Sequence, residues 1–470
     1  MTMKCSYKPA NAVQHRLAPS LINRQWLCPV LLLSCFILGH HSSGFLNTYI
    51  RSDPNRLTEK RKRIVVIGAG AAGLVAAAES AKRGADVVLL EKNSKTGVKI
   101  LMSGGTRCNL THNTDARGIT DVFGHAKRFL QPSVGSFPPA AVVEMFHELG
   151  VQTKIESTGK IFPESNRAVN VRDALHRNMI QSGVMLHLNS GVQSIHKADD
   201  SWRVRTDDAT ITADRVIVTT GGRSWPGCGT TGDAYAWLEQ LGHAIVRTRP
   251  ALVPLVGGRP WMNELSGITL ADCTASVRQV GAKKKKKPLI QRRAGWLFTH
   301  LGFSGPAAMD VSGKMTEAES MKDVALTIDL VPDVGEKQLE QMLSDRSGGG
   351  RQTLVSIVGQ WLPSRLTQSL IDQCGGDVSI AELPRKRMQL VLDGLKRLEL
   401  PVNGTRGFAK AEVTAGGVAL SEVDPKTMAS RKADGLYIAG EVLDVDGLIG
   451  GYNFQAAFST GRAAAIAAST

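Results

Sequence analysis

Three glycines and one acid are spaced as a dinucleotide-binding site requires. The glycines are Gly68, Gly70 and Gly73, directly after the apolar run Ile64–Ile67, and Glu91 ends the next apolar run. Glycine permits a sharp turn out of a strand, close approach of backbone N–H groups to a pyrophosphate, and tight helix–strand packing. A carboxylate at the tip of the second strand can accept the ribose hydroxyls of an adenosine. The pattern therefore predicts binding of the ADP half of a dinucleotide.

The elements that must position these residues occur in the expected order. The run from Arg63 to Ile67 predicts a strand, and the alanine-rich stretch that follows predicts a helix ending at Gly84. Val87–Leu90 predicts a second strand, which places Glu91 at its tip. The N-terminus of the helix would then face the phosphates. This order of strand, turn, helix, strand and acid disfavours a chance glycine-rich turn.

The C-terminal part of the chain favours FAD over NAD. Both cofactors share the ADP half, so the glycine motif alone cannot separate them. Gly435–Glu441 predicts a short buried strand that leads into a glycine and an acid, and Gly450–Gln455 leads into an alanine-rich helix. In two-dinucleotide flavoproteins, such an arrangement places a carboxylate near the ribityl phosphate and a helix start beneath the flavin ring. The two ends of the chain together therefore indicate FAD.

Several long motifs, in one order from about Arg63 to Ala465, resemble the BaiN/YhiN-like FAD-dependent oxidoreductases, also called aminoacetone-oxidase-like. The matching segments are Lys99–His112, Thr219–His243, Pro250–Leu255, Leu297–Ala307, Ala411–Met428 and Gly435–Gly461. Thr106 stands where the family usually has a third glycine, and Cys228 where it usually has threonine. Neither departure removes a backbone element that FAD binding needs. The resemblance implies the family and FAD, and no particular substrate.

These motifs define the residues expected to contact FAD, and the resemblance places the strand at Val192 along the adenine. The full set is Gly68, Ala69, Gly70, Ala71, Ala72, Gly73, Glu91, Lys92, Lys99, Ser103, Gly104, Gly105, Arg107, Cys108, Asn109, Val192, Thr220, Gly221, Gly222, Gly440, Glu441, Gly451, Asn453, Phe454 and Gln455. Cys108 follows Arg107 in a loop that the family places near the flavin, so a chemical role and tight packing are both open for its thiol.

Two residues are the candidates for catalysis. Arg107 can stabilise negative charge that develops on a flavin or substrate oxygen. His300 can donate a proton to a carbonyl or conjugated double bond, since imidazole titrates near neutral pH. The alternative is that His300 only satisfies backbone groups of a sheet. We expect the active-site cavity between the segments Ser103–Asn109, Phe298–Ser304 and Gly450–Gln455.

The predicted fold class is α/β, with a Rossmann-like FAD-binding domain interrupted by an inserted domain. After Pro250 the sequence predicts short strands in which apolar and polar residues alternate, such as Val324–Leu330. From about residue 335 to 400 the apolar residues recur with the period of a helix. The FAD elements resume near Gly407. The insert is therefore expected to hold an antiparallel, barrel-like sheet and helices. The predicted parts are a targeting leader or disordered extension at 1–62, FAD-binding residues 63–250, an insert at 251–405, and FAD-binding residues 406–470.

A second glycine-rich motif, Gly227–Gly232, is not expected to bind a nicotinamide dinucleotide. Four residues, Arg223–Pro226, separate it from its strand, which is too far for the tight turn. It is interpreted as a loop that ends in a capping box of Thr230 and Asp233. If NAD(P)H is the donor, it must then dock transiently in the substrate cavity, which forces ping-pong kinetics.

The positive charge of the chain is concentrated in two segments. Of the formal net charge of +15, residues 1–62 carry +7 and the loop Lys283–Arg293 another +7, which leaves about +1 for the rest. No nucleic-acid partner is therefore expected. Lys283–Lys287 is expected to form a solvated hairpin tip, with contact to an anionic surface, a nucleic acid or a partner as the alternative.

Residues 1–62 have the composition of a targeting leader. They hold nine Lys and Arg against two acids, and Trp26–Leu38 is an apolar run typical of a signal peptide. The acid-free first half equally suits an organellar transit peptide, and a bipartite leader would explain both features. A glycan on the sequon Asn109–Thr111 would obstruct the flavin loop. We therefore expect a plastid or mitochondrial residence, with the cytoplasm as the alternative, and no membrane span in the mature chain.

The sequence thus predicts an FAD-dependent oxidoreductase that acts on a small molecule, with NAD(P)H as a possible donor. The seven cysteines form no CxxC pair, so neither dithiol chemistry nor a metal site is predicted. One alternative is a flavin-binding redox sensor or assembly protein without turnover. Another is a tRNA-modifying flavoprotein, which the basic loop alone favours.

Overall fold

A five-stranded parallel sheet forms the centre of the FAD-binding part. The computed structural model describes residues 61–282, 286–345 and 352–470, so residues 1–60 of the predicted leader lie outside the described residues. The strand order is β20-β10-β1-β2-β6, and every neighbouring pair is parallel. The strands are β1 (Arg63–Ile67), β2 (Asp86–Leu90), β6 (Met185–His187), β10 (Arg215–Val218) and β20 (Leu436–Ile438). The apolar runs of β1, β2, β10 and β20 are buried because helices cover a parallel sheet, whereas the edge strand β6 is largely exposed.

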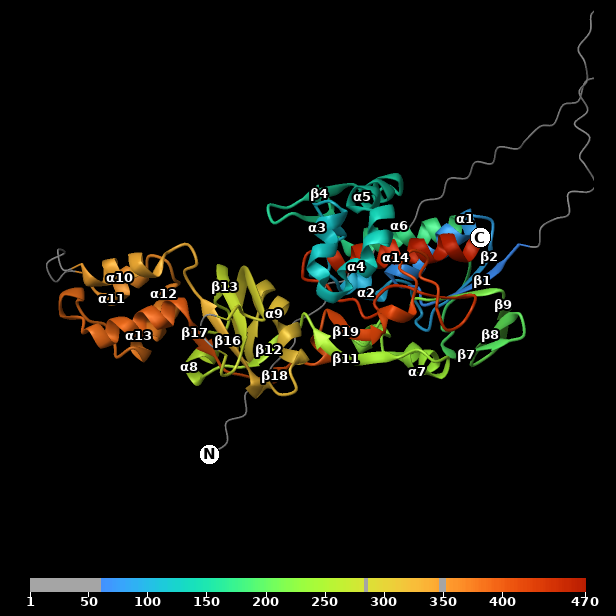
Figure 1. The fold of residues 1–470 in the computed structure, drawn as a ribbon. Helices are drawn as coiled ribbons and strands as arrows, with labels where there is room; N and C mark the ends of the chain where they lie inside the picture. The colour runs from blue at the N-terminus through green and yellow to red at the C-terminus, as the bar shows by residue number, and fades with distance from the viewer. Residues whose placement is uncertain (1–60, 283–285, 346–351) are drawn as a thin grey trace, which may run out of the picture. The chain divides into compact units, whose positions relative to one another are not determined.

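Two helices from opposite ends of the chain pack side by side (Figure 1). They are α1 (Ala71–Lys82) and α14 (Tyr452–Ser469). A Cβ added to Gly461 would lie 2.5 Å from the carbonyl oxygen of Ala72, so a glycine is needed where they touch. Both helices begin at the same end of the sheet, which brings the two predicted cofactor motifs together.

Smaller elements surround this sheet. The helices are α2 (Val98–Met102), α3 (Ala116–Thr120), α4 (Lys127–Ser136), α5 (Pro139–Glu148), α6 (Ala168–Gln181) and α7 (Asp233–Gln240). One antiparallel sheet consists of β3 (Thr111–His112), β4 (Thr153–Ile155) and β5 (Lys160–Pro163). Another consists of β7 (Val192–Ala198), β8 (Ser201–Thr206) and β9 (Thr210–Ala213). The β4–β5 hairpin contributes to the site described below.

The insert is built on a seven-stranded antiparallel sheet of order β17-β16-β13-β14-β15-β12-β18. Its strands are β12 (Leu255–Gly257), β13 (Thr269–Gln279), β14 (Ile290–Thr299), β15 (Gly302–Ser304), β16 (Val324–Asp329), β17 (Leu398–Leu400) and β18 (Val402–Thr405). Only Pro401 separates β17 from β18, which are the two edges of the sheet. The sheet must therefore curl until its edges meet, as in a barrel.

Helices complete the insert and give it a hydrophobic core of its own. They are α8 (Pro260–Glu264), α9 (Pro306–Glu317), α10 (Glu336–Ser344), α11 (Leu354–Val358), α12 (Ser364–Gln373) and α13 (Arg385–Lys396). The chain leaves the FAD-binding part after β11 (Ile245–Ala251) and returns at β19 (Val413–Val418), and these strands pair antiparallel. The predicted fold class, a parallel Rossmann-like sheet with an inserted antiparallel sheet and helices, is confirmed.

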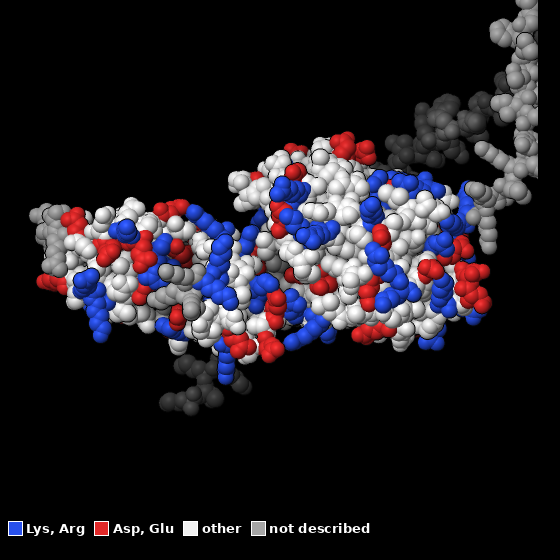
Figure 2. Space-filling model, in the orientation of Figure 1, with Lys and Arg blue, Asp and Glu red and all other residues white. Residues whose placement is uncertain are grey.

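The surface charges agree with the net charge of about +1 that the sequence gives outside the leader and the basic loop. Figure 2 shows Lys and Arg side chains interspersed with Asp and Glu over the face in view. The basic loop joins β13 to β14, with Lys286 and Lys287 exposed, while 283–285 lie outside the described residues. Within the described ranges, no helix has the length and apolar character that crossing a bilayer requires.

Candidate active site

A cavity of about 590 Å³ opens at the carboxyl ends of the parallel strands, where open α/β sheets bind their ligands. Most residues of the predicted FAD set line it. They are Gly68, Ala69, Gly70, Ala71, Ala72, Glu91, Lys92, Lys99, Ser103, Gly104, Gly105, Arg107, Asn109, Val192, Thr220, Gly221, Gly440, Glu441, Gly451, Asn453 and Phe454. The insert closes one side with Leu297, Ser304–Pro306 and Met309. One cavity thus joins the cofactor motifs to the insert.

Three other members of the predicted set hold the surrounding structure together instead of lining the cavity. A Cβ on Gly73 would lie 1.8 Å from the Gly68 carbonyl oxygen, so this glycine lets α1 pack on the turn after β1. A Cβ on Gly222 would lie 2.4 Å from Thr414 Oγ1. Gln455 is fully buried, and its Nε2 donates to the carbonyl oxygen of Phe137 at 2.7 Å.

Cys108 is the fourth member of the predicted FAD set that does not line the cavity, and its side chain is fully buried. Burial raises the pKa of its thiol to about 12. A thiol at neutral pH is a poor nucleophile, since the thiolate is the reactive form. Its surroundings therefore favour the tight-packing role over a chemical one.

The starts of α1 and α14 both face the cavity, and in the described part of the chain no side chain accepts from the N–H groups of their first three residues. Gly70 and Gly451 are the N-cap residues, and among the residues that the structure describes no side chain caps either helix. The first N–H groups of a helix lack partners within the helix. They are therefore available to a ligand, and the helix dipoles favour negative charge at both positions. The pair suits a cofactor that carries a pyrophosphate at one end and an electron-accepting ring at the other.

Glu91 is buried at the tip of β2, with both carboxylate oxygens oriented by hydrogen bonds. Its Oε2 accepts from the Ala69 backbone N at 2.8 Å, and its Oε1 accepts from the backbone N and Nδ2 of Asn93 at 2.9 and 2.8 Å. Acceptor capacity remains on each oxygen, because an ionised carboxylate offers about four lone-pair sites. Glu91 can therefore also accept the ribose hydroxyls of an adenosine.

Replacing Glu91 with alanine is expected to weaken FAD binding by about 1.5 to 3 kcal/mol, the cost of lost hydrogen bonds to a charged group. This equals a roughly 10- to 150-fold rise in Kd. Titration of the FAD-free protein with FAD, followed by flavin fluorescence, measures the change. Asp86→Ala, at the exposed start of the same strand, is the matched control and should bind FAD normally. An unchanged Kd in Glu91→Ala would contradict the assignment.

Lys99 and Glu441 form an ion pair in the cavity wall. Lys99 Nζ donates to Glu441 Oε2 and to Ser224 Oγ, both at 2.5 Å. Glu441 Oε1 accepts from Ser224 Oγ at 2.7 Å and from the backbone N of Thr414 at 2.8 Å. The predicted carboxylate is thus fixed by a cation and by β19, so its orientation is set before any ligand binds.

The second glycine-rich motif lies against the tip of β2 and does not begin another dinucleotide-binding fold. Asn93 Nδ2 donates to the Cys228 carbonyl oxygen at 3.1 Å, which joins this loop to the tip of β2. The predicted capping box is wrong. The N-cap of α7 is Gly232, with φ of +82°, and Thr230 Oγ1 instead donates to the carbonyl oxygens of Ser224 and Trp225. The Thr230 hydroxyl is therefore bonded within the loop and does not cap α7.

Arg107 reaches the cavity, whereas His300 does not. Arg107 Cζ lies 4.0 Å from the centre of the Phe162 ring, and its Nη1 donates to Glu156 Oε1 at 2.6 Å. His300 is exposed and lines a neighbouring cavity of about 330 Å³, which shares Leu297 and Ser304 with the first. The predicted cavity between three segments exists, with Ser304 rather than Phe298 or His300 as the contribution of the third segment.

Asn109 joins the glycine-rich loop to the start of α14. In the amide orientation that satisfies its neighbours, it donates to the carbonyl oxygens of Ile161 and Thr111 at 3.1 and 3.0 Å. Its oxygen accepts from the Gly451 backbone N at 3.0 Å. This side chain is buried, so the sequon at this position is not accessible to a glycan in the folded protein.

Residues 62–467 match the family described as the HI0933-like protein Rossmann domain. The chain belongs to this family. The predicted membership of an FAD-dependent oxidoreductase family is thereby confirmed, and FAD is its cofactor.

Two curated relatives of this HI0933-like chain match it over nearly their whole length. The ribosomal RNA dihydrouridine synthase of Escherichia coli is 32% identical over 85% of this chain and 96% of its own length. The 3-dehydro-bile acid delta(4,6)-reductase of Clostridium scindens is 30% identical over 86% of this chain and 98% of its own. Among solved structures, the 3-ketosteroid-delta4-(5alpha)-dehydrogenase of Rhodococcus jostii matches 89% of this chain and 99% of its own, with 16% identity and a TM-score of 0.43.

Sequence reasoning missed several cavity residues of the HI0933-like chain. Lys160 and Phe162 come from the β4–β5 hairpin, and Met309 comes from α9. None of the three lies in a cofactor motif, so only the fold brings them to the site. Glu412 also lines the cavity, and its sequence context could have identified it. It is a lone acid beside the apolar strand Val413–Val418 within one of the family-like segments.

Proposed function

We propose that this chain uses FAD to reduce a carbon–carbon double bond conjugated to a carbonyl group, with NAD(P)H as the electron donor. The observation that carries the proposal is the single cavity shared by the cofactor motifs and the insert. The names of the two relatives support the reaction type. Dihydrouridine forms by saturation of the uracil double bond, and a 3-dehydro-delta(4,6) steroid is a conjugated dienone.

The residues present fit FAD. The first N–H groups of α1 would hold the pyrophosphate, Glu91 the adenosine ribose, and the start of α14 the negative charge of the reduced ring. When bound, FAD supplies the hydride chemistry. The protein supplies orientation and electrostatics, as the remaining residues of the cavity indicate.

The insert side of the cavity is suited to an uncharged conjugated substrate. Leu252, Leu297 and Met309 give it an apolar wall, which strengthens electrostatic interactions by excluding water. Arg107 can stabilise negative charge on the carbonyl oxygen as the double bond is reduced. Of the five sheets in the described part of the chain, only one is parallel, so NAD(P)H would dock transiently in this same cavity. Ping-pong kinetics follow.

A uracil base of ribosomal RNA is the second substrate candidate. Its double bond is conjugated to a carbonyl, so the chemistry is the same. The specific observations in favour are the synthase from Escherichia coli, matched over nearly its whole length, and the cation Lys160 in the cavity wall. Against it stands the nearly neutral body of the chain, since RNA binding depends strongly on cationic contacts with phosphates.

The test is an anaerobic two-step experiment on the FAD-loaded protein. NADH or NADPH should bleach the flavin, and a conjugated enone, a steroid dienone or unmodified ribosomal RNA should then restore its colour. Mass spectrometry distinguishes a product that has gained two hydrogens from dihydrouridine in digested RNA. If oxygen alone restores the flavin, the reductase proposal fails and the predicted redox sensor without turnover takes its place.

A further inference from the structure

We propose that Glu412 is the acid that protonates the substrate during this reduction. The proposal rests on the proposed function and replaces His300 as the proton source. Glu412 lies directly before β19, where the chain returns from the insert, and it is one of the residues that line the cavity.

Glu412 differs from the other carboxylates of the cavity in having no partner. Four acids line the cavity. Glu91 accepts backbone hydrogen bonds, Asp233 pairs with Lys92 at 2.5 Å, and Glu441 pairs with Lys99 at 2.5 Å. In the described part of the chain, the half-buried carboxyl group of Glu412 has neither a hydrogen bond nor an ion pair. It is therefore available to a ligand in the cavity.

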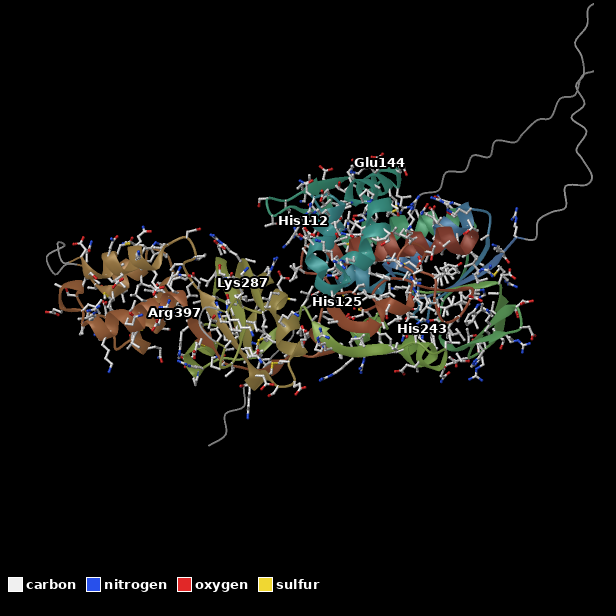
Figure 3. All side chains as sticks on the ribbon, in the orientation of Figure 1. His112, His125, Glu144, His243, Lys287 and Arg397 are labelled. Carbon is white, nitrogen blue, oxygen red and sulfur yellow. The ribbon has the colours of Figure 1, made fainter. Side chains whose placement is uncertain are left out.

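The backbone at Glu412 is firmly held. Its N–H donates to the Leu252 carbonyl oxygen at 3.0 Å, and the next residue along the chain pairs with β11. Further along β19, the Gly416 backbone N donates to Asp444 Oδ1 at 3.0 Å, and Asp444 Oδ2 lies 3.0 Å from Nε2 of His125, which Figure 3 labels. A carboxyl group on a fixed strand end can be positioned against a substrate with little loss of entropy.

The surroundings favour a protonated carboxyl group. Burial raises the pKa of Glu412, the nearby cation Lys99 partly opposes this, and the negative charge of Glu441 adds to it. Since Lys99 is already paired with Glu441, its charge is largely compensated. A general acid must hold its proton near the working pH, and raising a carboxyl pKa by burial is how proteins achieve this.

The proton and electron balance of the step is complete. The β-carbon of the substrate receives a hydride from reduced FAD, which accounts for both electrons. The electrons of the double bond move towards the carbonyl, and the α-carbon receives the proton of the Glu412 carboxyl group as its O–H bond breaks. The saturated product leaves, and the Glu412 carboxylate takes a proton from water before the next turnover.

Other titratable groups of the region are poorly placed for this role. His300 lines the neighbouring cavity, and Cys108 is buried outside the lining. Asp310 also lies outside the lining, and its carboxylate is held by Arg292 at 3.1 Å and by the Ile449 backbone N at 2.8 Å. Glu412 is thus the group that combines access to the cavity with an unpaired carboxyl whose pKa is raised by burial.

The test compares the two half-reactions in Glu412→Gln, which keeps the shape of the side chain but has no acidic proton. Reduction of the flavin by NAD(P)H should stay within about twofold of wild type, and reoxidation by the conjugated substrate should slow by roughly 10² to 10⁴. Asp446→Asn is the matched control. Burial also raises the pKa of Asp446, but this residue is outside the cavity lining, so both of its half-reactions should match wild type.

A second readout does not depend on turnover. A saturated ketone that binds the oxidised protein should lose affinity as the pH rises through the Glu412 pKa, because an uncharged ligand that covers the ionised, unpaired carboxylate removes it from water. In Glu412→Gln this pH dependence should disappear while binding persists. Flavin absorbance shifts measure both titrations.

The outcomes separate this proposal from the proposed function. If wild type is reoxidised by a conjugated substrate and Glu412→Gln matches its rate, Glu412 is not the acid. Slowing in His300→Ala instead would restore His300 to that role. If no conjugated substrate reoxidises the wild type, the proposed function itself fails, and the proton transfer with it. Retained pH dependence of ketone binding in Glu412→Gln would also overturn the assignment.

Discussion

Gly70→Val is expected to give a folded protein that no longer retains FAD. A Cβ at this position meets no atom within 4 Å, and φ is −80°, so the protein itself tolerates the side chain. The added methyl groups would instead occupy the cavity at the start of α1, where the pyrophosphate must approach the backbone. Loss of two charge-assisted hydrogen bonds, at about 1.5 kcal/mol each, would weaken binding by at least about 100-fold.

The flavin absorbance per chain of the purified protein measures this loss, and thermal unfolding of the FAD-free forms checks the fold. Gly335→Val is the matched control, because Gly335 is also an N-cap residue with open space around it and lies in the insert. It should retain one FAD per chain. Full FAD occupancy in Gly70→Val would mean that the phosphates do not lie at this turn.

The cofactor half of the site was predictable because its requirements are local. Gly68 has φ of +98°, Gly70 must leave room for a ligand, and Gly73 must leave room for the turn after β1. All three requirements fall within six consecutive residues, so the spacing of the glycines alone predicts the turn and the cofactor site. The same holds for Glu91, which must follow a strand of a particular length. The alternation of the Val324–Asp329 strand was readable for a similar reason, since every second residue faces the core.

The substrate half was not predictable, because it depends on pairing between distant segments. His300 was selected by its closeness in sequence to Phe298 and the glycine-rich turn. In the structure, Leu297 pairs with Ser304 across β14 and β15, and these two residues reach the flavin cavity. His300 occupies the turn beyond the pair and is exposed. Only the register of the hairpin decides which of these residues lines the larger cavity.

Glu412, by contrast, is a candidate that the sequence did not identify. Its motif was recognised as part of the family-like C-terminal segment, but the sequence assigned no role to this acid. Its environment arises from α2, which brings Lys99, and from the turn after β20, which brings Glu441. A carboxyl without a partner is visible only when all neighbours are in place, since sequence does not show which acids are paired.

Gly73→Ala should fail in the opposite way to Gly70→Val, by destabilising the fold itself. The new Cβ would lie 1.8 Å from the Gly68 carbonyl oxygen and 2.6 Å from Thr219 Oγ1. That hydroxyl donates to the carbonyl oxygens of Ile67 and Gly68, both at 2.9 Å, so it cannot move without loss of hydrogen bonds. Overpacking usually costs about 1 to 3 kcal/mol, and a clash with backbone should reach or exceed the upper value.

Gly135→Ala is the matched control, since Gly135 is an exposed helical glycine of α4 with nothing within 4 Å of an added Cβ. There the same change should stabilise the protein by about 0.5 to 1 kcal/mol, because alanine favours helix over glycine. Urea unfolding of the FAD-free proteins gives both values with their opposite signs. Equal midpoints for Gly73→Ala and wild type would show that α1 can move away from β1, and that the third glycine of the motif serves the cofactor instead of the packing.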